Sequence, residues 1–375
     1  MARLFMKLPS FATDYSGAAS FLSDIGGLVA VHGPTGCIGN YTGYDDPRWF
    51  SSPGMVFNSA LREIDAVMGN DHALIENMRK ACEIYNPCFT AIVGTPIPDL
   101  IGCDITGAAD DLEKVIGIPS VGVPTNGYGY YHNGIEKSMF ALEKKFSVLS
   151  CPNRGKINIL GHSHYDYGDG SAMEILADAI ADSHRSIGFG SPADGLAAFT
   201  DIGCADANIA VSSSGMKFAE YLENSLNMPF IASAPIGAAN TELIKDFIKG
   251  NRYEETRESG NILIIGDHVV SDSLRREIFR ETGLGSDVAT FFGLHDKTAG
   301  KRDIVLRDEN DLINISKRYE IIVGDPLYSS LAPGNLPFVP FAHPAVSGKM
   351  FREHGIGMIG LMERVKEAIR RSGVS

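Results

Sequence analysis

The sequence contains 375 residues, of which 44% are hydrophobic and 21% are charged, and its formal net charge is −13 at pH 7. This length predicts two or three domains, and the composition is that of a globular α/β protein. The negative charge argues against nucleic acid or an anionic membrane as a partner. The sequence has no apolar run of about 20 residues and no secretory signal pattern at its start, so we expect a cytoplasmic protein.

Short runs of Val, Ile, Leu and Ala alternate along the chain with glycine- or proline-containing turns and amphipathic stretches. This alternation predicts parallel strands joined by crossover helices, and therefore an α/β fold. The predicted strands are 28–32, 89–93, 119–123, 156–160, 186–189, 208–212, 229–232, 262–265, 288–292 and 319–323. The predicted helices are 72–84, 135–146, 172–184, 216–226, 240–249, 272–282 and 357–371.

Two polar breaks divide the chain, "CPNRGK" at 151–156 and "RYEETRESGN" at 252–261, and a new strand follows each of them. We therefore predict three domains, at 1–151, 152–258 and 259–375. Ligands of parallel α/β sheets bind beyond the carboxyl ends of the strands, so the chemistry is expected in the loops that follow strands. The six cysteines are too sparse for a disulfide framework, and most are expected to be free thiols.

Five segments carry a resemblance to a known family. They are "VHGPTGC" (31–37), "SALREIDAVMGN" (59–70), "VGTPIPDLIGCDI" (93–105), "NMPFIASAPIGAANTELI" (227–244) and "LPFVPFAHPAVSG" (336–348). In order and spacing they resemble the component 1 family of nitrogenase-like oxidoreductases. The resemblance implies three Rossmann-like domains around a central cleft, and a homodimer or a heterodimer with a related subunit. It also implies an ATP-dependent iron-sulfur reductase as electron donor, an intersubunit cluster and a small-molecule substrate.

The sequence departs from that family at its cysteines. Of the three cluster cysteines that the resemblance implies, only Cys37 is present, because the other positions fall on Phe11 or Ala12 and on Pro96. The thiolate that holds the active-site cofactor in the family would fall near Ser212 or Ser213. Cys103 replaces the first Asp of the family's Ile-Gly-Asp-Asp pattern.

Three interpretations of Cys37 and Cys103 remain open. Iron-sulfur clusters require thiolate ligands, and one cysteine per chain cannot hold a cubane. If a dimer axis passes beside these loops, Cys37 and Cys103 of two protomers together supply four ligands for a bridging [4Fe-4S] cluster. Alternatively, Cys37 is a relic and Cys103 caps a helix, or the two residues belong to a single-metal site.

Polar loops after later strands supply candidate ligand-binding residues. Two histidines two residues apart in "GHSHYDYGDG" (161–170) can bind a metal or an anion. The segments "SSSG" (212–215) and "PIGAAN" (235–240) precede helices, so their amides can cradle a carboxylate or simply cap the helix. We predict a polar cavity between domains, with ordinary polar loops or a collapsed apolar seam as the competing picture. The candidate ligand-binding residues are His162, His164, Tyr165, Ser213, Ser214, Gly237, His268 and His343.

Two hypotheses about function follow. The first is an oxidoreductase that reduces an unknown small molecule, without assigned catalytic residues. The second is a non-catalytic protein of the same fold that binds or carries a metal cofactor or an anionic ligand. The loop "TNGYGYYHNG" (125–134) lacks the third glycine of a dinucleotide fingerprint, so NAD is not expected.

Overall fold

The computed structural model describes residues 5–46, 48, 54–69, 71–148, 155–168, 171–253, 257–348 and 360–373. The chain forms two compact units. Unit 1 comprises Met1–Ser10, Asn153–Gly190 and Ala205–Ser375, and unit 2 comprises Phe11–Pro152 and Ser191–Cys204. The predicted segment 152–258 is thus divided between the two units, and the three-domain division stays a prediction. Within the described ranges, no helix is both long and apolar enough to cross a bilayer.

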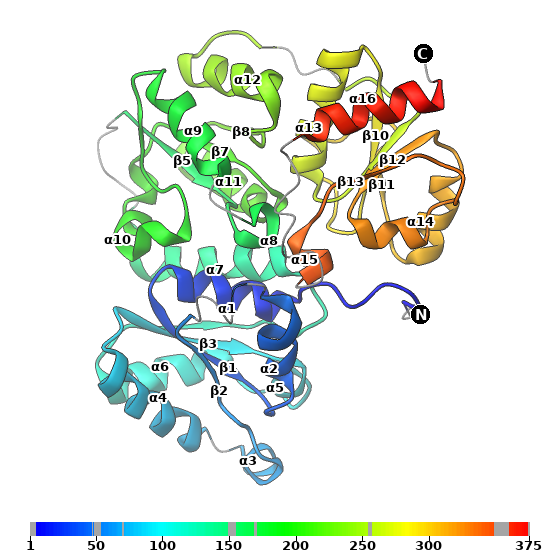
Figure 1. Cartoon of the computed structure of the whole chain (residues 1–375). Helices are drawn as coiled ribbons and strands as arrows, with labels where there is room; N and C mark the ends of the chain where they lie inside the picture. Colours follow the sequence, from blue (N-terminus) through cyan, green and yellow to red (C-terminus); the bar gives the residue numbers. More distant parts are fainter. Residues whose placement is uncertain are drawn as a thin grey trace. The chain divides into compact units, whose positions relative to one another are not determined.

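Unit 2 contains a parallel sheet with the strand order β2-β1-β3-β4. Its two central strands, β1 and β3, are buried along their whole length, because helices cover both faces of the sheet. Figure 1 shows α1 and α7 on one face and α4 and α6 on the other. The strands are β1 (Gly27–His32), β2 (Val56–Asn58), β3 (Phe89–Gly94) and β4 (Ser120–Val123).

The helices of unit 2 connect its strands, or come before the first strand or after the last one. They are α1 (Asp14–Asp24), α2 (Cys37–Asn40), α3 (Glu63–Met68), α4 (His72–Tyr85), α5 (Pro96–Leu100), α6 (Ile105–Ile116), α7 (Tyr131–Phe146) and α10 (Gly195–Thr200). A π-helical turn, η1 (Tyr41–Asp45), and two 3-10 turns, η2 (Pro192–Asp194) and η3 (Ile202–Cys204), complete it. The Val148 amide donates to the Thr200 carbonyl at 2.8 Å, which ties the segment at 191–204 to this unit.

Unit 1 contains two further parallel sheets. The second sheet has the order β6-β5-β7-β8, and Asn158 and Asn208 join β5 to β7 through a side-chain hydrogen bond of 2.9 Å. Its strands are β5 (Lys156–Leu160), β6 (Ser186–Ile187), β7 (Ala207–Ala210) and β8 (Phe230–Ala232). Its helices are α8 (His164–Tyr167), α9 (Ser171–Ala181), α11 (Ser213–Leu226) and α12 (Gly237–Lys249).

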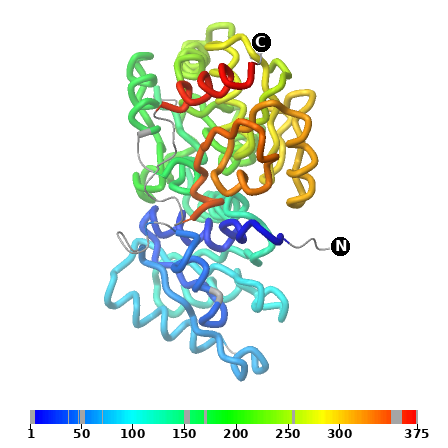
Figure 2. The backbone as a smooth tube through the Cα atoms, turned by 45° about the vertical axis from the view of Figure 1, so that its right-hand side comes forward, coloured from blue at the N-terminus to red at the C-terminus, as the bar shows by residue number. Residues whose placement is uncertain are grey.

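The third sheet has the order β11-β10-β9-β12-β13. The C-terminal helix α16, red in Figure 2, packs on α13, β12 and β13. The strands are β9 (Ile262–Ile265), β10 (Ser286–Thr290), β11 (Ile304–Val305), β12 (Ile321–Gly324) and β13 (Phe338–Pro340). The helices are α13 (His268–Thr282), α14 (Glu309–Ser316), the 3-10 turn η4 (Pro326–Ser330), α15 (Pro344–Ser347) and α16 (Leu361–Ser372).

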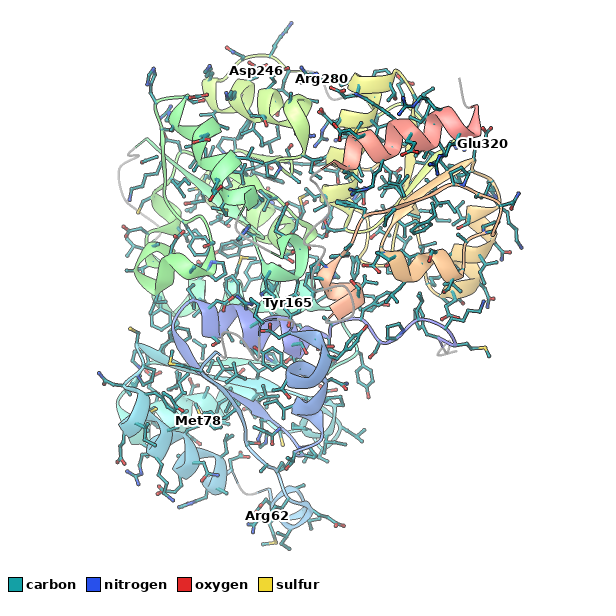
Figure 3. All side chains as sticks on the ribbon, in the orientation of Figure 1. Arg62, Met78, Tyr165, Asp246, Arg280 and Glu320 are labelled. Atoms are coloured by element: carbon teal, nitrogen blue, oxygen red, sulfur yellow. The ribbon has the colours of Figure 1, made fainter. Side chains whose placement is uncertain are left out.

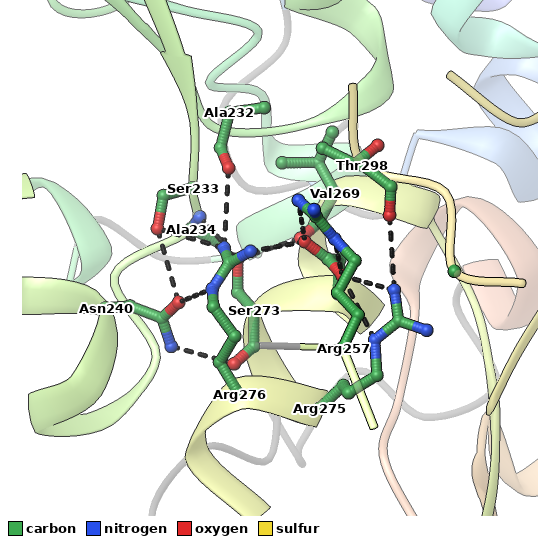
Figure 4. A network of polar contacts seen from close by, with 12 residues as sticks. Ala232, Ser233, Ala234, Asn240, Arg257, Val269, Ser273, Arg275, Arg276 and Thr298 are labelled. Carbon is green, nitrogen blue, oxygen red and sulfur yellow. Dashed lines mark hydrogen bonds and ion pairs between the residues drawn. The ribbon is translucent and has the colours of Figure 1, made fainter. Parts of the chain in front are cut away.

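A buried network of charges connects the second and third sheets within unit 1 (Figure 4). Arg276 of α13 donates to Asn240 of α12 at 2.8 Å and to the Ala232 carbonyl at the end of β8 at 3.4 Å. Asp272 accepts hydrogen bonds from Arg257, Arg275 and Arg276. A fully buried carboxylate is tolerated here because three guanidinium groups surround it, and they hold its pKa below the usual range against the effect of burial.

In each sheet, strand order reverses beside a central strand. These switch points lie between β1 and β3, between β5 and β7, and between β9 and β12. Loops that leave such a pair of strands run in opposite directions, which opens the crevice in which α/β proteins bind ligands. The fold therefore points to the loops that follow these six strands.

Candidate functional site

Within unit 1, the loop after β5 at the second switch point meets the loop after the edge strand β13 of the third sheet, through an acidic residue and a histidine. Asp166 lies in α8, after β5, and His343 lies immediately before α15, after β13. The His343 Nε2 atom is 3.6 Å from Asp166 Oδ1, and Ser163 Oγ donates to Asp166 Oδ2 at 2.7 Å. Both residues are buried, and α8 packs directly on α15.

A second carboxyl group, Asp267, lies beside this pair at the end of β9. It accepts hydrogen bonds from the amide of Ser213 at 3.0 Å and from the amide of Val269 at 3.0 Å. Burial raises the pKa of Asp267, and the negative charge of Asp166 raises it further. A carboxyl group with a raised pKa next to another carboxyl and a histidine can hold a proton and pass it on.

Asp325 fixes the backbone that carries His343. The Asp325 carboxylate accepts hydrogen bonds from the His343 amide and from Ser347 Oγ, each at 2.8 Å. Burial raises the pKa of Asp325, while the hydrogen bond from the His343 amide opposes that shift. The His343 ring also packs edge-on against Phe292, with 5.1 Å between ring centroids.

A small cavity lies against Asp166, Asp267 and His343. Its volume is about 10 Å³, which is close to the least space that holds one water molecule. The cavity at this place therefore suits a proton-relaying water and is far smaller than the few-hundred-Å³ ligand sites that α/β clefts usually contain.

The predicted residues of the 161–170 segment lie around this cluster. His162 is half-buried and stacks on Tyr167, with 5.3 Å between ring centroids. The Tyr167 hydroxyl donates to the Val211 carbonyl, which links this segment to the end of β7. His164 is buried, and Tyr165 is fully buried at α8, where Figure 3 labels it. Their role in binding a ligand stays a prediction.

The two helix N-termini that were expected to cradle an anion are occupied by carboxylates of the chain itself. Asp267 binds the Ser213 amide at the start of α11, and Glu277 of α13 accepts from the Ala239 amide in the first turn of α12 at 2.8 Å. Ser213 and Ser214 are buried, whereas Gly237 is exposed. An external anion at either helix would have to displace an internal carboxylate.

His268 is committed to the third sheet instead of to this cluster. Its Nδ1 atom accepts from the His295 amide at 3.1 Å and contacts Thr298 Oγ1 at 3.1 Å. Its Nε2 atom is 3.6 Å from Asp303 Oδ2. Because Nδ1 accepts a hydrogen bond, the proton of the neutral ring lies on Nε2, facing Asp303.

Cys37 and Cys103 follow neighbouring strands at the first switch point. Cys37 begins α2 after β1, and its side chain lies outside the described part of the structure. Cys103 follows β3, is half-buried and packs against an apolar cluster that includes Leu112. Burial raises the pKa of the Cys103 thiol, and Asp71 raises it further. Cys82, Cys88 and Cys103 are free, whereas Cys204 is disulfide-bonded.

These features define an α/β protein built from repeated, doubly wound parallel sheets, with polar side chains at the switch points. A family model described as "Nitrogenase component 1 type Oxidoreductase" matches residues 13–249, and the chain belongs to this family. A solved structure of nitrogenase Cp1 at pH 6.5 matches with a TM-score of 0.73 and 17% identity, and the match covers 99% of this chain and 94% of that one. The fold is thus that of nitrogenase component 1.

Several curated proteins are similar in sequence. The nitrogenase iron-molybdenum cofactor biosynthesis protein NifE of Methanosarcina barkeri is 30% identical over 39% of this chain and 35% of its own length. Component CfbD of the Ni-sirohydrochlorin a,c-diamide reductive cyclase complex of Methanosarcina acetivorans is 32% identical over 32% and 31%. The nitrogenase molybdenum-iron protein beta chain of Methanothermobacter marburgensis is 24% identical over 73% and 64%. The chain therefore spans less than two thirds of each relative.

Sequence reasoning missed Asp267 and Asp325 as site residues. Both follow a buried strand and a glycine, in "IIGDH" and "IVGDP", and both cap the next helical turn through their side chains. The strand-Gly-Asp pattern was present in the sequence, and an Asp at this position is a strong N-cap signal. Asp267 and Asp325 also bind a neighbouring strand-end loop, and these contacts depend on tertiary packing.

Proposed function

We propose that this chain is the component 1-type subunit of a two-component reductase. In this proposal, a separate ATP-dependent iron-sulfur reductase supplies electrons and a small molecule is reduced. Membership of the family supports the proposal, as does similarity to CfbD, which is named as a component of a reductive cyclase complex.

The observation that carries the proposal is the position of the first-sheet loops. The His-Gly-Pro-Thr-Gly-Cys loop leaves β1, and the loop with Cys103 leaves the neighbouring strand β3, so both occupy one switch point. Such loops are where an electron-carrying group would be held.

The described side chains of one chain do not fit a complete cluster. Among them, no group of three His, Cys, Asp or Glu residues is arranged to hold a metal ion. A [4Fe-4S] cluster would need Cys37 and Cys103 from two protomers, and when bound it would supply single electrons. The chain itself would contribute protonation, because Asp166, Asp267 and His343 form a buried set that can hold and move a proton.

Anaerobic purification followed by iron and acid-labile sulfide analysis tests the proposal. We expect iron, sulfide and a visible charge-transfer absorbance that both Cys37→Ser and Cys103→Ser abolish. Cys88→Ser is the control, because Cys88 is an exposed free thiol at the opposite end of the sheet, before β3. Iron and sulfide near zero in the native protein would contradict the cluster-dependent reductase.

A second candidate function is a scaffold that carries a metal cofactor without reducing it. Similarity to NifE, which is named as a cofactor biosynthesis protein, favours this candidate, as does the single family cysteine that remains. The two candidates differ in one outcome. A reductase accepts electrons from its donor protein in the presence of ATP, whereas a scaffold binds metal without an electron-transfer signal.

A further inference from the structure

A pocket in unit 2, separate from the cluster around Asp166, has the features of a ligand site. It has a volume of about 230 Å³ and lies between the carboxyl ends of β1 and β2 and the helices α3 and α4. Its wall is largely apolar, with a few polar groups. The lining residues that the argument uses are His32, Ser59, Leu61, Arg62, Ala73 and Leu74.

His32 brings an unsatisfied hydrogen-bonding group to this pocket. The residue is 3% exposed, and its Nε2 atom has no hydrogen-bond partner. Ser59 Oγ is 2.9 Å from Nδ1 and 3.4 Å from the Gly33 carbonyl, while it accepts the Gly33 amide at 3.0 Å. When the Ser59 hydroxyl donates to Nδ1 instead of to the Gly33 carbonyl, the neutral ring carries its own proton on Nε2. A buried donor without an acceptor costs about 1–3 kcal/mol, which a ligand would recover.

The N-terminus of α4 supplies further donors at the same pocket. Asp71 precedes the 14-residue helix, but its backbone is helical and its side chain makes no capping hydrogen bond. Ala73 and Leu74 occupy the second and third helical positions, whose amides an N-cap side chain would normally satisfy. Both residues line the pocket together with His32, so the N-terminus of α4 and the positive end of its helix dipole lie at this pocket.

The remaining charges at the pocket compensate one another. Asp65 is buried and could repel an anion, but Arg62 binds it through two hydrogen bonds of 2.6 and 3.0 Å. Arg62 immediately precedes α3 and is labelled in Figure 3, and its side chain stays largely exposed. The imidazole and the helix N-terminus favour an acceptor with negative charge. Burial lowers the pKa of His32 and the charge of Asp71 opposes that shift, so the Asp71 carboxylate also reaches this pocket and counts against an anion.

We propose that this pocket binds a small monocarboxylate with an apolar body. The carboxylate accepts from His32 Nε2–H and from the first-turn amides of α4, and the apolar body packs against Leu61 and Leu74. The backbone supports a built site, because Ala60 lies in the left-handed region at φ 54° and its amide donates to Asn58 Oδ1 at 2.6 Å. Strain of this kind in a residue other than glycine concentrates at functional sites. The proposal is independent of the reductase function.

Benzoate is the probe, and benzamide is its uncharged counterpart of the same shape. In a protein with ¹³C-labelled histidine, we expect benzoate to shift the His32 ring signal with a Kd of about 1 mM, as expected for a ligand of this size. Benzamide should bind at least about tenfold more weakly, because it lacks the charge. A His32 signal that stays unchanged at about 20 mM benzoate, well above the expected Kd, would overturn the proposal.

Variants at Ala73 and His32, with a control at His184, separate the site from the fold. Ala73→Asp places a carboxylate of the chain at the first-turn amides of α4, where it stabilises the helix and competes with benzoate. The affinity for benzoate should therefore fall at least about tenfold, while Tm is maintained. Ala73→Asn, without the charge, should bind within about threefold of the native protein. By calorimetry, His32→Leu should lose the probe, whereas the exposed control His184→Asn should not. Equal benzoate affinity in Ala73→Asp and the native protein would sink the assignment.

Discussion

Gly237 is required by the close approach of Glu277. A Cβ atom at this position would lie 2.1 Å from the Glu277 Cδ atom, and the backbone is left-handed at φ 71°. Glu277 is buried and accepts the Ala239 amide, so it cannot simply move aside. The residue that was predicted to bind an anion is thus a position where the chain's own carboxylate leaves no space for a side chain.

We therefore predict that Gly237→Ala lowers the free energy of unfolding by about 3 kcal/mol, through left-handed strain and displacement of Glu277. Gly250→Ala is the matched control, because Gly250 has nearly the same φ of 69° and nothing within 4 Å of its Cβ position. Strain alone should cost about 1 kcal/mol there. Equal urea midpoints for the two variants would show that Glu277 yields freely.

His295 gives a prediction for pH dependence. Burial, with a smaller effect of the neighbouring His268 and Lys217, lowers the pKa of His295 to about 4. Between that value and the unfolded value of about 6.5, the unfolded chain binds more protons than the folded chain. Stability contributed by the neutral ring is therefore present above pH 6.5 and is lost as pH falls towards 4.

The measurement is an NMR titration of the His295 ring proton, with urea midpoints at several pH values. We expect a titration midpoint near 4, and a stability gain of His295→Gln over the native protein that is larger at pH 5 than at pH 7.5. A midpoint at or above about 6, close to the ordinary histidine value, would contradict the assigned burial.

The sequence pattern predicted the bounds of two strands well and the first residues of helices poorly. The strands predicted at 156–160 and 262–265 have the observed bounds of β5 and β9. The helices predicted from 216, 240 and 272 begin at Ser213, Gly237 and His268. The first turns of these helices contain Ser, Gly and His, which are found in loops and caps as readily as in helices. The predicted site loops therefore include helical first turns.

The missed strands have a related explanation. β2 and β11 contain three and two residues, too few for a periodic pattern, and β13 ends in Pro340. Proline in a short run argues against a strand, but here β13 is an edge strand, where proline is tolerated. The contacts of Asp166 with His343 and of Ser213 with Asp267 join residues far apart in sequence, and no local pattern encodes them.

The packing of α1 against α7 depends on two glycines. A Cβ at Gly134 would lie 1.7 Å from the Asp14 carbonyl oxygen, and one at Gly17 would lie 2.1 Å from the Tyr131 carbonyl oxygen. Neither glycine has a positive φ, so backbone conformation does not require them. The two helices approach so closely that backbone fills the space of a side chain.

Gly134→Ala is predicted to cost about 3 kcal/mol or more, because the helices must separate and lose packing over their whole contact. Gly43→Ala, at a position with nothing within 4 Å, should change stability by less than about 1 kcal/mol. Thermal unfolding of both variants measures the difference. A Gly134→Ala protein with the native Tm would mean that the helices do not touch at this point.

The oligomeric state of the protein decides whether a [4Fe-4S] cluster can bridge two protomers. Several large apolar side chains are exposed on α3 and α5, which follow β2 and β3 in unit 2. Val67, Met68 and Leu100 are 76%, 72% and 76% exposed. Large exposed apolar side chains can mark contact with another protein surface. Since these helices leave the carboxyl ends of the same sheet as Cys37, we propose that this surface joins two copies of the chain.

The proposal predicts a mass of about twice 40.4 kDa by light scattering at micromolar concentration, since most homodimers are two-fold symmetric and one patch then contributes twice. Met68→Lys and Leu100→Lys together would place four charges, two from each copy, in that interface. The double variant should be a monomer, and the Tm of the chain should not change. Val305→Lys changes an exposed apolar residue on β11 and should leave the dimer intact. If the native chain is a monomer, cysteines from two copies cannot meet, and a bridging cluster would require a different, related subunit.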